Sequence, residues 1–154
     1  MGTKITRIHE VATEAQRALL LIISSTSDTQ SQLERRAEEL VSLVDTMGVV
    51  SEHVEYVTLR QPNSSTLIGS GKVGELTALI DELSVDLVIF EISLPPRIQR
   101  NLEQLWQCAV IDRDEVILQI FADRAQTKEA VLQVELARLE YSLPRLTRKW
   151  THLS

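Results

Sequence analysis

The sequence predicts an α/β protein: a small open parallel four-stranded sheet with helices on both faces, followed by a projecting helical arm. The continuous apolar run at residues 18–24 and the largely apolar segment 86–92 are typical of central parallel strands covered on both faces. Segments with helical periodicity separate the strands, so strand and helix alternate until a last short strand. We therefore divide the chain into a polar lead (1–16), a parallel α/β domain (17–113) and a helical arm (114–154).

The first strand and helix have the clearest signals. The run "ALLLIIS" at residues 18–24 has no polar residue before its last position. Thr29 followed by Gln32 makes a capping box, which predicts the start of a helix. Gly48 is expected to end that helix. Its apolar residues recur at helical spacing and comprise Leu33, Ala37, Leu40, Val44 and Met47.

The second strand, residues 53–59, alternates polar and apolar residues in part, which indicates the edge of the sheet. A polar loop over residues 60–66 follows, and a glycine turn then begins a second helix. The apolar face of that helix consists of Val73, Leu76, Ile80 and Leu83. We expect right-handed crossovers and, by analogy with other small doubly wound sheets, the strand order 2-1-3-4.

A third helix begins at Pro95 and Pro96, because the missing N–H of proline costs little in a first helical turn. We expect its inner face to consist of Ile98, Leu102 and Leu105. Residues 108–112 form the last strand, and Cys108 at its start is expected in the core.

Composition restricts the function classes. The chain has 154 residues, a net charge of −6 and one cysteine. The acidic balance disfavours a general nucleic-acid coat but permits a local basic patch. The lone cysteine excludes an internal disulfide and fits a reducing cytoplasm. No apolar run is long enough to span a membrane, and we expect no membrane partner.

The segment "TLIGSGKVGEL" resembles a phosphate loop but departs from that motif twice. The motif requires glycine where Thr66 stands, and a hydroxyl residue where Val73 follows Lys72. We interpret the segment as a glycine turn that begins a helix. Gly69, Gly71 and Lys72 remain a candidate site for a weak anion contact, since helix N-termini attract anions.

The arm carries an apolar stripe at helical spacing, consisting of Leu132, Leu136, Leu139 and Leu143. Burying the stripe would contribute about 6–12 kcal/mol at roughly 1.5–3 kcal/mol for each side chain, as an upper bound. A stripe of this size needs a partner. Three partners stay open: the α/β domain itself, a second copy of the chain, or a helix from outside the chain.

The C-terminal end is basic and aromatic, with Arg145, Arg148, Lys149, Trp150 and His152 close together. Cations beside an aromatic ring suit RNA, through phosphate pairing and base stacking. The alternative is a solvated chain terminus.

Other chemistry has weaker signals. The three histidines and the cysteine lack metal-ligand spacing, so we expect no metal site. The pairs Asp112–Arg113 and Asp123–Arg124 bracket a helix and indicate ion pairs that join the sheet to the arm. No catalytic arrangement stands out, and none is assigned.

From residue 66 onward the sequence resembles the N-terminal region of HflX-type GTPases. The resembling stretches are "IGSGKVGEL", "DLVIFEISLPPRIQRNLEQ", "VIDRDEVILQIFADRAQTKEAVLQVELARLEYSLPRL" and "WTHLS". The resemblance implies a parallel α/β domain, a helical hairpin arm, a cytoplasmic location and binding to the large ribosomal subunit. It also implies a role in splitting or rescuing ribosomes under stress.

In that family a glycine-rich loop, a returning arm helix and the GTPase domain follow the last stretch. The arm of this chain is therefore expected to be half of a helical hairpin. GTP and Mg²⁺ would belong to the missing GTPase domain, so we expect no cofactor and no hydrolysis here. The leading hypothesis is a non-catalytic ribosome-binding and regulatory module whose partners are large-subunit RNA, the missing arm helix and the GTPase domain. The alternatives are a protein-interaction domain that dimerises through the leucine stripe, and a weak nucleotide-binding α/β domain.

Overall fold

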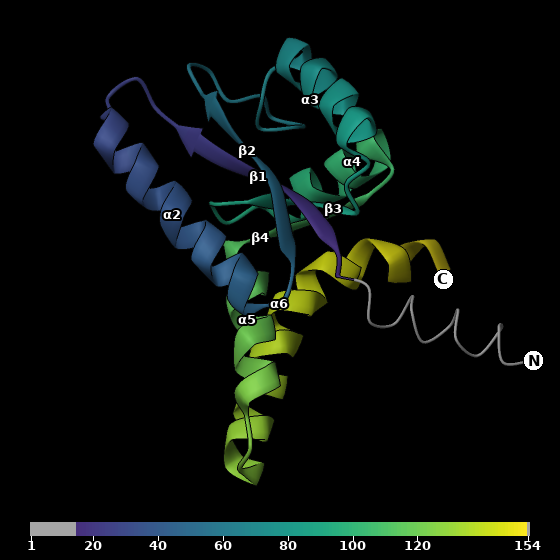
Figure 1. Ribbon diagram of the computed structural model, residues 1–154. Helices are drawn as coiled ribbons and strands as arrows, with labels where there is room; N and C mark the ends of the chain where they lie inside the picture. The colour runs from purple at the N-terminus through teal and green to yellow at the C-terminus, as the bar shows by residue number, and fades with distance from the viewer. Residues whose placement is uncertain (1–14, 154) are drawn as a thin grey trace, which may run out of the picture.

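β1 (Arg17–Ser24) lies inside a four-stranded parallel sheet with the order β2-β1-β3-β4 (Figure 1). The computed structural model describes the backbone of residues 15–153 and the side chains through Arg145. The other strands are β2 (Val50–Thr58), β3 (Leu87–Phe90) and β4 (Ala109–Asp112). The predicted fold class and strand order are confirmed.

The alternation of side chains along β1 divides the core into two layers. One set of alternate residues packs under α3 (Ser70–Leu83) and α4 (Pro96–Trp106), and consists of Leu19, Leu21 and Ile23. The other set packs against α2 (Gln30–Thr46) and α5 (Arg113–Arg124), and consists of Ala18, Leu20 and Ile22. All six are at most 6% exposed, as a central strand covered on both faces requires.

α2 (Gln30–Thr46) has the predicted capping box. The Thr29 hydroxyl accepts a hydrogen bond from the Gln32 N–H at 3.3 Å, and the Gln32 side chain accepts one from the Thr29 N–H at 2.9 Å. Gly48 follows the helix with a φ of 86°, a left-handed conformation that glycine adopts without strain. β2 then begins at Val50, three residues before the predicted start.

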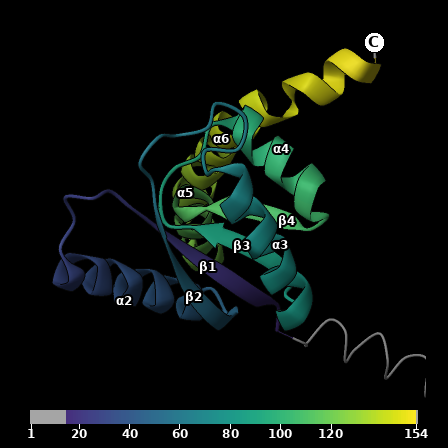
Figure 2. The same cartoon turned by 90° about the horizontal axis from the view of Figure 1, so that it is seen from above.

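α3 (Ser70–Leu83) and α4 (Pro96–Trp106) cover the opposite face of the sheet from α2 (Figure 2). One part of the predicted inner face of α4 is wrong: Leu105 is 54% exposed, whereas Trp106 is 5% exposed. The indole stacks on Phe90 of β3, with ring centroids 6.3 Å apart. The larger aromatic ring therefore occupies the inner position at the end of the helix.

The chain after the sheet forms an antiparallel helical hairpin from two helices of its own, where the sequence had led us to expect half of a hairpin. α5 (Arg113–Arg124) runs away from the end of β4, and α6 (Lys128–Leu153) returns beside it to the sheet (Figure 1). α6 continues past Pro144, and its last turns point away from the sheet (Figure 2). Within residues 15–153, no helix is both long enough and apolar enough to cross a bilayer.

Candidate functional site

Asp112, at the end of β4, joins the sheet to the arm. Its carboxylate is fully buried and accepts hydrogen bonds from the Glu115 N–H at 3.2 Å and the Tyr141 hydroxyl at 3.0 Å. Its other oxygen accepts from the Leu94 N–H at 2.9 Å. A single carboxylate thus caps α5, holds α6 and fixes the loop before α4.

Arg145 on α6 completes this joint. Its Nη2 lies 3.6 Å from the Asp112 carboxylate and donates to the Leu94 carbonyl at 3.0 Å. Its Nε donates to the buried Gln99 side chain at 2.7 Å, and its guanidinium lies 3.5 Å from the centre of the Tyr141 ring. Only 18% of this side chain is exposed. The geometry favours a structural role for Arg145 over the predicted RNA contact.

The environment of the joint raises the pKa of two titratable groups, Tyr141 and Glu115. Burial and the Asp112 charge raise the pKa of the Tyr141 hydroxyl well above its usual range. Burial also raises the pKa of the Glu115 carboxyl, with the Asp112 charge adding to the effect and Arg145 opposing it. Glu115 therefore titrates in a partly enclosed site beside the joint.

The predicted ion-pair network between sheet and arm is partly correct. Asp112 does make the connection, but its cationic partner is Arg145. Arg113 pairs instead with Glu39 of α2, and Asp123 accepts a hydrogen bond from Gln119 within α5.

α6 exposes its leucines and partly buries its smaller apolar residues. The residues of α6 that face α5 are mostly small, and among them Ala130, Val134 and Ala137 are partly buried. At about 100° per residue, the leucine stripe falls on the opposite side of α6. The exposed fractions are 59% for Leu132, 58% for Leu136, 55% for Leu139 and 59% for Leu143.

Packing of the stripe on the α/β domain is therefore excluded. A hollow of about 440 Å³ adds to the apolar surface of the arm where α5 and α6 meet. Phe121 of α5, which lines that hollow, is 58% exposed. An exposed apolar surface of this extent marks an interaction site.

The glycine turn offers less to an anion than the sequence suggests. Gly69 is the N-cap of α3, and Gly71 lies in its first turn. The Lys72 ammonium pairs with Glu55 at 3.1 Å and with Glu75 at 3.2 Å. The only cation of the turn is therefore already paired with two carboxylates, which would also repel a phosphate. This geometry disfavours the nucleotide-binding alternative.

The rest of the basic end lies outside the described side chains. The structure gives Arg148, Lys149, Trp150 and His152 a helical backbone in the last turns of α6, and their contacts stay a prediction. Among the described residues, no group of histidine, cysteine and carboxylate side chains could hold a metal ion. Cys108 is partly buried against the core, and burial raises its pKa.

Two adjoining family profiles match the sequence. The profile described as "GTP-binding GTPase N-terminal" matches residues 34–122, and the one described as "GTP-binding GTPase Middle Region" matches residues 124–154. The first of these alone covers more than half of the chain. The chain belongs to the HflX-type GTPase family, as an N-terminal region of it. The boundary between the two profiles falls at the end of α5.

Relatives named GTPase HflX align over most of this chain. The HflX of Treponema denticola is 53% identical over 79% of this chain and 31% of its own length. The HflX of Akkermansia muciniphila is 40% identical over 95% of this chain, and that of Escherichia coli K12 is 39% identical over 90%. The chain spans about a third of the length of these HflX proteins.

Solved structures share this fold. A GTP-binding protein from the archaeon Sulfolobus solfataricus, in complex with GDP, superposes with a TM-score of 0.65 at 26% identity. The alignment covers 88% of this chain and 40% of that protein. A second structure, a complex of SsGBP and GDP, gives a TM-score of 0.66 at 27% identity and covers 86% of this chain and 37% of its own.

Sequence reasoning missed the members of the joint other than Asp112 and Arg145. Tyr141 and Gln99 lie in separate helices, and no local motif connects either residue to Asp112. The available signal was Asp112 directly before α5, since aspartate is a preferred N-cap residue. It predicts the cap on α5 but not the contacts to α4 and α6.

Proposed function

We propose that this chain is the ribosome-binding and regulatory module of an HflX-type GTP-binding protein, and that its arm contacts RNA of the large subunit. The observation that carries this proposal is the arm itself, a hairpin with exposed apolar residues that a buried polar joint fixes to the sheet. Family membership supports the same function. The module performs no hydrolysis, and the GTPase domain of the whole protein would hold GTP and Mg²⁺.

The RNA contact is assigned to the residues that follow the joint on α6: Arg148, Lys149, Trp150 and His152. Arg145 is left out because its donors are engaged within the chain. Two cations would pair with phosphates, and the indole would stack on an unpaired base. The chain is acidic as a whole, with a net charge of −6, so RNA would approach this end in preference to the rest of its surface.

Co-sedimentation with purified large ribosomal subunits over a range of salt concentrations tests this function. We expect binding at low salt, and we expect Arg148→Ala with Lys149→Ala to reduce the salt dependence by about two phosphate contacts. The matched control removes two exposed arginines of the body, Arg35→Ala with Arg60→Ala, and should leave binding unchanged. No binding at low salt, or equal losses in both variants, would refute the proposal.

The exposed leucines favour a second candidate function, self-association. In the whole protein the stripe would pack on a returning arm helix, and in this chain alone a second copy would supply the apolar surface. Light scattering should then show a dimer that Leu136→Asp dissociates, whereas Glu135→Gln, an exposed neighbour on α6, has no effect. A monomer at high protein concentration would rule out the dimer without affecting the ribosome proposal.

A further inference from the structure

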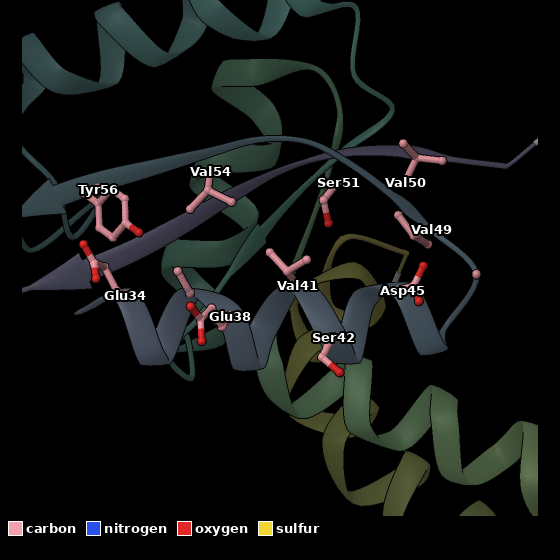
Figure 3. Close-up of a pocket in the computed structure, with 12 residues that line it drawn as sticks. Glu34, Glu38, Val41, Ser42, Asp45, Val49, Val50, Ser51, Val54 and Tyr56 are labelled. Atoms are coloured by element: carbon pink, nitrogen blue, oxygen red, sulfur yellow. The ribbon is translucent and has the colours of Figure 1, made fainter. Parts of the chain in front are cut away.

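A groove of about 700 Å³ lies between α2 and the edge strand β2 (Figure 3). Its floor is apolar: Val54 and Tyr56 of β2 face Val41 of α2 across it (Figure 3). Tyr56 is 40% exposed, so this face of β2 lacks the covering layer that β1 has on both sides. The groove shares no residue with the leucine stripe or the basic end.

The rim of the groove is acidic. Glu34, Glu38 and Asp45 line it from α2, and its lining contains no lysine, arginine or histidine. Within residues 15–145, none of these three carboxylates has a cationic partner, although Glu34 accepts a hydrogen bond from Gln30 at 3.2 Å. In contrast, the two glutamates of β2 are already paired: Glu52 with Arg17 and Glu55 with Lys72.

The backbone of β2 is open on the side of the groove. β2 ends the sheet, and no strand among the described residues pairs with its outer edge. The Leu59 N–H donates to the Ser24 carbonyl of β1, and backbone groups alternate in direction along a strand. The N–H and carbonyl groups of Tyr56 and Val54 therefore point to the free edge, where an extended segment can add to the sheet.

We propose that this groove binds an extended, basic segment of a partner protein, which adds to the free edge of β2. Lysine or arginine side chains on its groove face would lay their methylene stems on Val54 and Tyr56 and place their charges at the rim. Glu34 and Glu38 are separated by about 6 Å along α2, close to the roughly 6.6 Å between alternate residues of a strand. RNA would be repelled by the rim, and a second copy of this chain would bring two acidic rims together.

A synthetic peptide tests this site: acetyl-GKSKSVSKSG-amide, which places three lysines and a valine on one face of a strand. Amide NMR on the isotope-labelled full chain should show shifts at Val54, Tyr56 and Val41. A peptide with glutamate in place of lysine should not bind, and one with serine in place of valine should bind more weakly. Shifts that map elsewhere, or equal binding of the glutamate peptide, would overturn the proposal.

Two variants with the same loss of charge separate the groove from general attraction to an acidic protein. Glu38→Gln with Asp45→Asn should weaken the lysine peptide by about tenfold, since two ion pairs are lost. The control, Glu129→Gln with Glu135→Gln on the exposed face of α6, should leave the affinity within about twofold. Equal weakening in both would show that the rim has no specific role, and would overturn the proposal.

Two further measurements test the choice of occupant. Deletion of residues 1–14 should leave the peptide affinity unchanged, whereas a gain above about tenfold would show that the lead occupies the groove itself. Light scattering should show that the chain does not dimerise through the groove. A dimer that Val54→Asp dissociates would be the contrary result. Either contrary result would overturn the assignment to a partner protein.

Discussion

Leu19, Leu20 and Leu21 of β1 are fully buried, whereas Leu132 and Leu136 of α6 are more than half exposed. The residue type is the same, and the difference lies in what surrounds each element. β1 has a helical layer on each face, whereas α6 packs on α5 and, near its base, on α4, and leaves the side with these leucines exposed. The central strand of the sheet is therefore fully covered within the chain, whereas the arm offers apolar surface to a partner.

The largest loss of folding stability is expected when a fully buried leucine of β1 is shortened. Leu20→Ala should destabilise the chain by about 2–5 kcal/mol, because it leaves a cavity between the sheet and α2. Urea denaturation followed by circular dichroism measures this change. A loss below about 0.5 kcal/mol would mean that the layer on this face is loosely packed.

The second largest loss of stability is expected when the Asp112 carboxylate, which holds the joint together, is removed. Asp112→Ala leaves the Leu94 N–H, the Tyr141 hydroxyl and Arg145 without their shared acceptor, and should destabilise the chain by about 2–4 kcal/mol. Hydrogen exchange should show faster exchange in α5 and α6 than in β1. Uniform loss of protection would indicate that arm and sheet unfold as one unit.

A smaller change in stability is expected from Glu115→Gln, and its size depends on pH. The raised pKa means that the folded chain holds this proton more tightly than the unfolded chain, so ionisation lowers stability. The stabilising contribution is present below the ordinary pKa of 4.5 and is lost as pH rises through the folded value. Thermal melting should therefore find the variant more stable at neutral pH and similar to the parent near about pH 4.

The smallest effect on folding is expected at the stripe. Leu136→Ser should change the unfolding free energy by no more than about 0.5 kcal/mol, because its side chain is 58% exposed in the folded chain. Denaturation of the isolated chain at low concentration is the measurement. A loss near that of Leu20→Ala would show that a partner already covers the stripe, which would remove the contrast between the two regions.

The sequence predicted features that depend on local pattern. The apolar run of β1, the capping box of α2 and the position of Gly48 each follow from neighbouring residues, and all three are confirmed. The order of strands came from analogy with other doubly wound sheets, and the edge position of β2 from its polar character.

Features that depend on distant residues were harder to predict. Arg145 and Arg148 look alike in a basic segment, and only the buried Asp112 on another element gives the first a separate role. Leu105 and Trp106 both continue the apolar pattern of α4, and the position of Phe90 on β3 decides which one turns inward. The groove on α2 and β2 had no sequence signal, because it arises where the sheet ends.

The joint at Asp112 has a mechanical consequence. One carboxylate is bonded to α5, to α6 and to the loop that leads into α4, so the base of the hairpin is held firmly to the sheet at this point. The hairpin extends about 20 Å from Thr127 to Tyr141 at the rise of an α-helix. A small sideways force at its tip would thus produce torque at the base of α4, and the hairpin would act as a lever on the sheet.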